Sequence, residues 1–166
     1  MDDALDAALR FLSYRPRSEA EVRRRLARRF PGPSVDNAIV TLREQGLLDD
    51  AAFAQFWRQN RERSRPKGAS AMKWELLRMG VSREVADDAL EGLDENENAY
   101  RAASGISRRL GQSDYDAFRK KLVPYLRRRG FGSEATKGAV RRLWSELSDT
   151  VHGDIYGKGH GQQEED

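Results

Sequence analysis

The sequence contains no cysteine and only two histidines and five prolines among its 166 residues. Without cysteine, the chain can form neither a disulfide nor a thiolate metal site, and nothing indicates an oxidising compartment. Both histidines, His152 and His160, fall in a glycine-rich tail that offers too few ligands to hold a metal ion in fixed geometry. We therefore predict no metal site and no cofactor.

Catalytic motifs are also missing. Gly130-Phe131-Gly132 lacks the lysine and the preceding strand that a phosphate-binding loop needs. The paired carboxylates Asp49-Asp50 and Asp87-Asp88 fall at helix starts or on solvated faces, where acids complement the helix dipole. The sequence therefore predicts no catalytic residue and no enzymatic activity.

No apolar run approaches the length of a membrane span. The first residues, Met1 to Asp6, carry acids where a signal peptide needs positive charge. We expect a soluble, cytoplasmic monomer that does not contact membranes.

Charge is abundant but unevenly distributed. The net charge is +2 over residues 1–47, −3 over 48–98, +8 over 99–147 and −4 over 148–166. A basic body with an acidic tail suits a polyanionic partner or an acidic protein surface. The acidic segment from Asp87 to Glu97 either touches a basic patch on such a partner or is a solvated helix end.

Helical periodicity dominates the chain, and no long apolar/polar alternation predicts a strand. Ser18 to Glu21 fits a capping box, Asp49 and Ser82 can cap later helices, and Phe30-Pro31-Gly32-Pro33 predicts a turn. Charged residues make up 34% of the chain and hydrophobic residues 38%, so each core must be small. Small helical units bury enough apolar surface when they stack on their neighbours.

One turn pattern recurs at Phe30, Val81 and Phe131, which are 51 and 50 residues apart. Equal intervals beyond each turn carry matched residues, namely Val35, Ala86 and Thr136, then Ile39, Leu90 and Val140, then Leu42, Leu93 and Leu143. Chance periodicity is the alternative, but four matched positions in three copies favour true repeats.

We predict an all-α fold of three tandem three-helix repeats that form an elongated, curved, helix-turn-helix-like array. The predicted repeats span residues 1–47, 48–94 and 95–147, and the acidic, glycine-rich tail 148–166 is predicted to be disordered.

Aromatic residues at helical spacing predict core positions, although such rings can also stack on exposed bases. These residues are Phe53, Phe56, Trp57, Trp74, Tyr100, Tyr125, Phe131 and Trp144. Tyr14 is the expected exception, because it lies in a basic turn between Ser13 and Arg15.

Basic runs give the strongest functional signal. Each run alone can be a solvated helix face, but together they favour a phosphate-rich or acidic partner over a role in solubility. The candidate binding residues are Tyr14, Arg15, Arg17, Arg24, Arg25, Arg28, Lys120, Lys121, Arg127, Arg128, Arg129, Arg141 and Arg142.

Three ordered segments resemble the RecX family: Phe11 to Leu26, Gly46 to Trp57, and Tyr125 to Phe131. The resemblance covers about residues 4–147, and only the Phe30–Pro33 turn departs from the family's Arg-Gly-Phe-like pattern. RecX proteins are tandem three-helix-repeat modulators of the RecA recombinase that lie along the groove of the RecA–DNA filament.

The resemblance implies inhibition of RecA's ATP hydrolysis, strand exchange and coprotease activity, and thus a role in recombinational repair and the SOS response. It also implies weak, non-specific contact with single- and double-stranded DNA. The alternative is a sequence-independent DNA-binding protein that acts without RecA, because three-helix units overlap in outline with helix-turn-helix domains. Such a protein should lose affinity steeply with salt and show no dependence on RecA.

Overall fold

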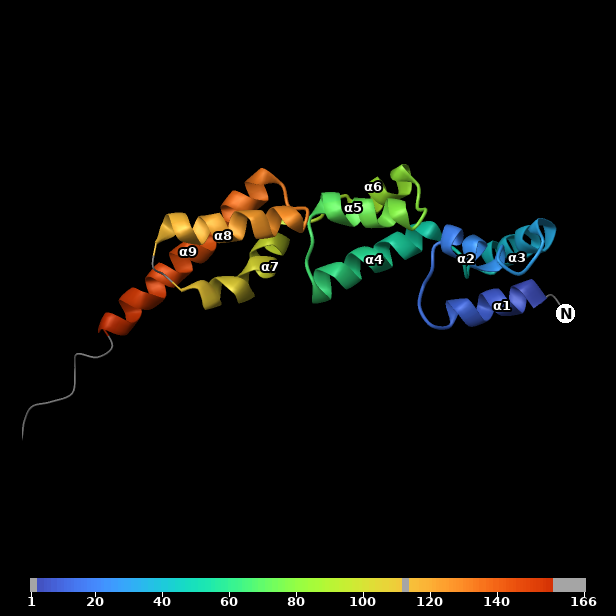
Figure 1. Ribbon diagram of the computed structural model, residues 1–166, viewed down its shortest axis with the longest axis horizontal. Coiled ribbons are helices and arrows are strands. Elements are labelled where there is room, and N and C mark those ends of the chain that lie inside the picture. Colours follow the sequence, from blue (N-terminus) through green and yellow to red (C-terminus); the bar gives the residue numbers. More distant parts are fainter. Residues whose placement is uncertain (1–2, 112–113, 157–166) are drawn as a thin grey trace, which may run out of the picture. The chain divides into compact units, whose positions relative to one another are not determined.

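The computed structural model describes residues 3–111 and 114–156, and within them the chain forms nine helices and no strand (Figure 1). In chain order the helices are α1 Asp3–Leu12, α2 Glu19–Leu26, α3 Gly32–Glu44, α4 Asp50–Ser64, α5 Ala69–Arg78, α6 Arg83–Leu90, α7 Glu95–Leu110, α8 Tyr115–Arg128 and α9 Ser133–Tyr156. Buried apolar side chains gather in three cores, one for each consecutive set of three helices. We call these sets group one (α1–α3), group two (α4–α6) and group three (α7–α9). The predicted all-helical repeat architecture is confirmed.

Matched positions fill the three cores. Val81 and Phe131 are buried at the turns of groups two and three, while Phe30 in group one is half-buried. The buried residues at the matched intervals beyond these turns are Val35, Ile39, Leu42, Ala86, Leu90, Thr136, Val140 and Leu143, and Leu93 is half-buried. Because the same register points inward in each group, the groups are copies of one structural unit.

Helix starts follow the predicted caps. The Ser18 hydroxyl accepts from the Glu21 amide at 3.1 Å, and the Glu21 carboxylate accepts from the Ser18 amide at 2.9 Å, which completes the capping box. Asp49 and Ser82 each accept from the backbone amide three residues later, at 3.1 and 3.2 Å. These side chains satisfy amides that have no partner inside the helix.

Glycine sets the turns of groups two and three. Gly80 and Gly130 adopt φ of +83° and +84°, a left-handed conformation that glycine reaches without a steric penalty. The residue after each glycine donates its amide to the carbonyl five residues earlier, at 3.1 Å in group two and 3.2 Å in group three. Group one has Arg29 at this place, and the Phe30 amide bonds instead to the carbonyl of Leu26, at 3.0 Å.

The first turn also ends earlier than predicted. Pro31 is the N-cap of α3 and the helix begins at Gly32, so Gly32 and Pro33 belong to the helix instead of the connection. Proline is tolerated there because the first helical amides have no partner within the helix.

Helix α9 corrects the predicted tail. It runs to Tyr156, so residues 148–156 are helical and not disordered. Trp144 and Leu147 pack against the core of group three, and the Ser148 and Thr150 hydroxyls donate to carbonyls four residues earlier, at 3.0 and 2.9 Å. Packing of the preceding turns thus carries the helix past the last core residue. The remainder of the predicted tail, residues 157–166, lies outside the described residues.

Trp74 is a second correction, because its side chain is 58% exposed instead of lying in the core. Met72 and Leu76 are the core residues of α5, and Trp74 lies between them in sequence and therefore on another face of the helix. The guanidinium of Arg78 stacks on the Trp74 ring, 4.6 Å from its centroid.

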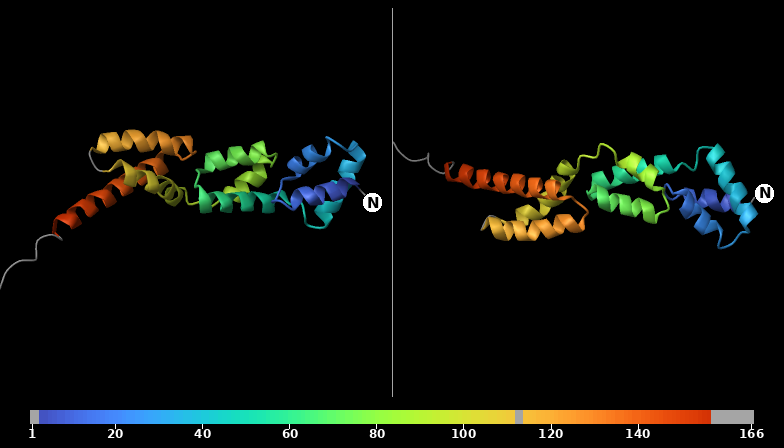
Figure 2. Two further views of the ribbon diagram at one scale, coloured as in Figure 1. Left: turned by 60° about the horizontal axis from the view of Figure 1, so that its bottom comes forward. Right: turned by 90° about the horizontal axis from the view of Figure 1, so that it is seen from above.

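The described residues divide into two compact units, one of residues 3–65 with 69–93 and one of residues 66–68 with 94–111 and 114–156. The first unit contains groups one and two, which meet at the start of α2. There the Ser18 hydroxyl donates to the carbonyl of Met79, and the Glu19 amide donates to the Asp50 carboxylate at 2.9 Å. Figure 2 shows the three helices of each group from two further sides.

The second unit contains group three together with the short segment Pro66–Gly68. The Gly68 amide donates to the carbonyl of Arg129 at 2.8 Å, and the Arg129 guanidinium donates to the carbonyl of Pro66 at 3.4 Å. Gly68 is buried against the backbone of Gly130, with no room for a side chain.

Asp50 makes stability depend on pH. Burial raises the pKa of the Asp50 carboxyl above its ordinary value, and the charges of Glu19 and Asp49 act in the same direction. Between the ordinary pKa of about 3.9 and the raised value, the unfolded chain loses this proton first, so stability falls as pH rises through that window. We expect Asp50→Asn to raise the free energy of unfolding at pH 7 by less than about 1 kcal/mol, and to have little effect at pH 3. Thermal melts at the two pH values measure this difference.

The matched control is Asp49→Asn, which removes a neighbouring negative charge from the same helix start but not a buried one. Asparagine caps helices as well as aspartate does, so this variant should melt close to the native chain at both pH values. A gain of equal size in both variants would contradict the assignment to burial.

Candidate functional site

Six of the predicted binding residues belong to group one, three before the start of α2 and three at or beyond its last turn, namely Tyr14, Arg15, Arg17, Arg24, Arg25 and Arg28. The Arg17 guanidinium stacks on the Phe11 ring, 4.0 Å from its centroid, and that of Arg25 lies 5.6 Å from the same centroid. Arg24, Arg25 and Arg28 line a shallow cavity of about 220 Å³ with Phe11 and Glu21. We call Arg24, Arg25 and Arg28 the N-terminal cationic cluster.

Glu21 partly neutralises two of the predicted arginines. It accepts from Arg15 at 2.6 Å and lies 3.9 Å from Arg17. Burial, and next the charge of Arg15, lower the pKa of the Arg17 guanidinium. Arg24, Arg25 and Arg28 are exposed, and none of them forms an ion pair with the part of the chain that the structure describes. The cluster therefore offers three uncompensated charges.

Tyr14 lies beside this region with 83% of its side chain exposed, as the sequence predicts. An exposed aromatic ring next to arginines is typical of surfaces that contact nucleic acid.

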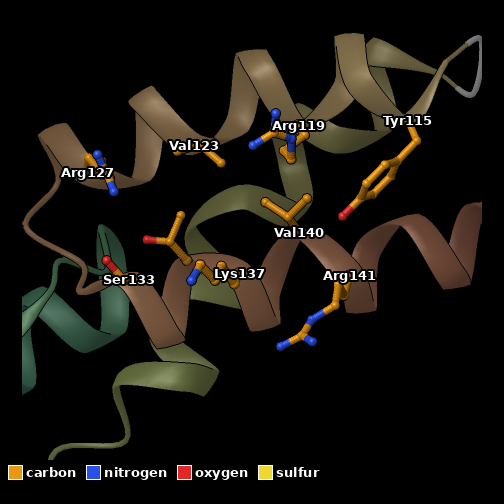
Figure 3. A pocket seen from close by; sticks show the side chains of 9 residues that line it. Tyr115, Arg119, Val123, Arg127, Ser133, Lys137, Val140 and Arg141 are labelled. Carbon is orange, nitrogen blue, oxygen red and sulfur yellow. The ribbon is translucent and has the colours of Figure 1, made fainter.

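Group three brings basic residues together around a cleft between α8 and α9 of about 330 Å³ (Figure 3). The cleft is lined by Tyr115, Arg119, Val123, Arg127, Ser133, Thr136, Lys137, Val140 and Arg141. Four of these residues are basic and none of the described lining residues is acidic. We call Arg119, Arg127, Lys137 and Arg141 the C-terminal cationic cluster.

The remaining predicted residues lie outside this cleft. Lys120 pairs with Asp116 at 2.8 Å, and this hydrogen bond raises the pKa of the Lys120 ammonium. Lys121 and Arg128 are exposed on α8. Arg129 bonds to the backbone of Pro66–Gly68, as described above.

Arg142 is occupied within its own group. It pairs with Glu97 at 2.9 Å and with Glu146 at 3.4 Å, and its guanidinium stacks 3.5 Å from the centroid of Tyr100. The carboxylates balance this charge, so Arg142 offers less to an anionic partner than its neighbour Arg141.

Sequence reasoning missed Thr136 and Lys137, and it placed Arg119 in a basic run with Lys120 and Lys121 without naming it as a candidate. Arg119, Val123 and Arg127 share one face of α8 because they are spaced by four residues, and Ser133, Lys137 and Arg141 share one face of α9 for the same reason. That spacing was readable in the sequence. What was not readable is that these two faces meet.

The described residues hold no group of three or more acidic or histidine side chains placed to bind a metal ion. No described helix is both long enough and apolar enough to cross a bilayer. The two cationic clusters are suited to electrostatic attraction and hydrogen bonding to an anion.

Residues 4–42 match the RecX first three-helix domain, and residues 49–90 match the RecX second three-helix domain. The chain is 35% identical to a regulatory protein RecX of Chlorobaculum tepidum, over 87% of this chain and 91% of that protein. It is 31% identical to a regulatory protein RecX of Chlorobium phaeobacteroides, over 85% of this chain and 93% of that protein.

The crystal structure of RecX from Lactobacillus salivarius has the same fold. Its TM-score is 0.75 at 23% sequence identity, over 84% of this chain and 94% of that chain. The helical groups, the matched domains and the identity to full-length relatives agree, and this chain belongs to the RecX family of regulatory proteins.

Proposed function

We propose that this protein binds the RecA–DNA filament along its groove and inhibits RecA's ATP hydrolysis, strand exchange and coprotease activity. It thereby modulates recombinational DNA repair and the SOS response in the cytoplasm. The proposal takes its partner from the regulatory relatives and its contact surface from this chain.

The observation that carries the proposal is the presence of two clusters of exposed basic residues, one in each compact unit. Arg24, Arg25, Arg28, Arg127 and Lys137 form no ion pair within the described residues, so their charges remain available to a polyanion. A nucleoprotein filament presents both phosphates and protein carboxylates to such surfaces.

The test is a titration of RecA–single-strand filaments, with ATP hydrolysis and co-sedimentation followed in parallel. The test variant combines Arg24→Glu and Arg25→Glu with Arg127→Glu and Lys137→Glu. We expect at least about a tenfold increase in the concentration that gives half-maximal inhibition, because each reversal turns an attraction into a repulsion.

The control is Arg63→Glu with Arg101→Glu, two exposed arginines outside both clusters. This pair should inhibit within about twofold of the native chain, since distant surface charges are screened by salt. Full inhibition by the reversed-cluster variant would refute the proposed contact surface. DNA binding without any effect on RecA would favour the alternative of a DNA-binding protein that acts independently.

A further inference from the structure

Thr136 buries a hydroxyl that has no hydrogen-bond partner among the described residues. The side chain is 1% exposed and takes the core position at which groups one and two carry Val35 and Ala86. An unpartnered hydroxyl in such a place costs folding free energy that an apolar residue of the same size does not cost. Packing alone therefore favours valine over threonine at this position.

Thr136 also lines the cleft between α8 and α9, where the C-terminal cationic cluster lies. Arg127 and Lys137 line the same cleft with exposed side chains that form no ion pair in the described part of the chain. Long, unpaired side chains can turn toward a ligand at little cost. The cleft thus combines positive charge with an unused hydrogen-bond donor.

The basic residues with which α8 lines the cleft are spread along the helix. Arg119 and Arg127 lie on one face, eight residues apart, which is about 12 Å along a helix. A row of this length matches successive phosphates of one strand better than it matches a single carboxylate. The cleft volume of about 330 Å³ is also within the range of small-ligand sites.

Tyr115 gives the cleft an aromatic end. The side chain is 40% exposed, and Figure 3 shows its ring extending from the start of α8 toward the gap between the two helices. The ring of Trp144 supports it edge-on, with the centroids 5.3 Å apart. A supported, partly exposed ring can take an unstacked base, which a single strand offers and a duplex does not.

We propose that the α8–α9 cleft binds a short stretch of single-stranded nucleic acid. Arg119, Arg127 and Lys137 contact successive phosphates, the Thr136 hydroxyl donates to a phosphate oxygen, and Tyr115 carries a base. This assignment rests on the proposed function, which requires a surface facing the filament's DNA, and it names the place and the chemistry of that contact.

The test measures binding of a fluorescein-labelled 15-nucleotide oligo-dT to the full chain by anisotropy, without RecA, over a series of NaCl concentrations. Arg127→Gln with Lys137→Gln should weaken binding about tenfold and reduce the slope of log K against log [NaCl] by about 0.7 for each phosphate that the variant no longer neutralises. Thr136→Val should weaken binding about tenfold while leaving that slope unchanged, because it removes a neutral donor and no charge. The pair Arg63→Gln with Arg101→Gln serves as the charge-matched control and should stay within about twofold.

Thr136→Val should also melt at or above the native temperature, which separates weaker ligand binding from a damaged fold. Native oligo-dT affinity in both the Thr136→Val and the Arg127→Gln/Lys137→Gln chains would overturn the proposal. The proposal would also be overturned if these variants bound oligo-dT normally but poly-glutamate more weakly, because the cleft would then hold a protein carboxylate.

The absence of RecA from this assay keeps the two proposals separable. A chain that binds oligo-dT through the cleft but never inhibits ATP hydrolysis refutes the proposed function and leaves the cleft assignment standing. If cleft variants keep both native inhibition of RecA and native oligo-dT affinity, the cleft assignment is refuted and the proposed function stands.

Discussion

Replacing Gly68 by alanine is expected to lower the free energy of unfolding of the second unit by about 3 kcal/mol or more. A Cβ at this position would collide with the carbonyl group of Gly130 and with the amide nitrogen of Phe131. These are backbone atoms, so no side chain can rotate away to relieve the collision. The hydrogen bond from the Gly68 amide to the Arg129 carbonyl would have to lengthen or break.

Amide hydrogen exchange by mass spectrometry resolves this effect within the unit. Peptides from α8 and α9 should lose protection in Gly68→Ala, and the Gly68 amide should exchange freely. Gly105→Ala is the matched control, because a Cβ there meets nothing within 4 Å and alanine favours a helix interior by about 0.5–1 kcal/mol. The two substitutions should therefore shift protection in opposite directions. Native protection in Gly68→Ala would contradict this prediction, because it would mean that the backbone around Gly130 shifts to accept a Cβ at little cost.

Replacing Gly80 by alanine is expected to cost the first unit about 2–4 kcal/mol. The positive φ of +83° costs an alanine about 1–2 kcal/mol, and a collision with the Cβ of Ala20 adds the penalty of an overpacked contact. This contact joins group two to group one, so the destabilisation should appear in both groups when urea unfolding is followed by hydrogen exchange.

Gly92→Ala isolates the backbone-strain part of this cost, so its difference from Gly80→Ala measures the steric part. Gly92 also has a positive φ, +70°, but a Cβ there meets nothing within 4 Å. This variant should therefore carry the backbone strain alone. Equal destabilisation in the two variants would mean that the approach of Ala20 to Gly80 contributes nothing to stability.

Local sequence signals predicted three helix starts correctly. Capping depends on residues three apart, and the Ser18 box, Asp49 and Ser82 all cap helices as predicted. The core register was also readable, because each group buries the same intervals after its turn. The predictions for Trp74 and for the end of α9 were wrong. Trp74 lies on a different face of α5 from the core residues and is exposed, and α9 continues through a polar segment because its preceding turns pack against the core.

The candidate site was harder to predict, because tertiary contacts decide which cations remain uncompensated. Arg142 and Arg141 are adjacent, but Glu97, 45 residues away in sequence, neutralises only the first. Asp116 pairs with both Arg119 and Lys120, at 3.3 and 2.8 Å, whereas Arg127 lies two turns beyond Arg119 and forms no ion pair within the described residues. A list of basic residues from the sequence therefore does not distinguish those that are free to bind an anion from those that are already paired.

The membership of Pro66–Gly68 in the second unit has a consequence for cutting the protein into fragments. Because those three residues precede α5 in the chain but pack beside Arg129, no single scission yields both units intact. A fragment starting at residue 94 lacks the peptide that satisfies the Arg129 carbonyl, and the complementary fragment carries that peptide with nothing to bind. Excision of either half therefore produces an incomplete fold, and function must be dissected by substitution within the whole chain.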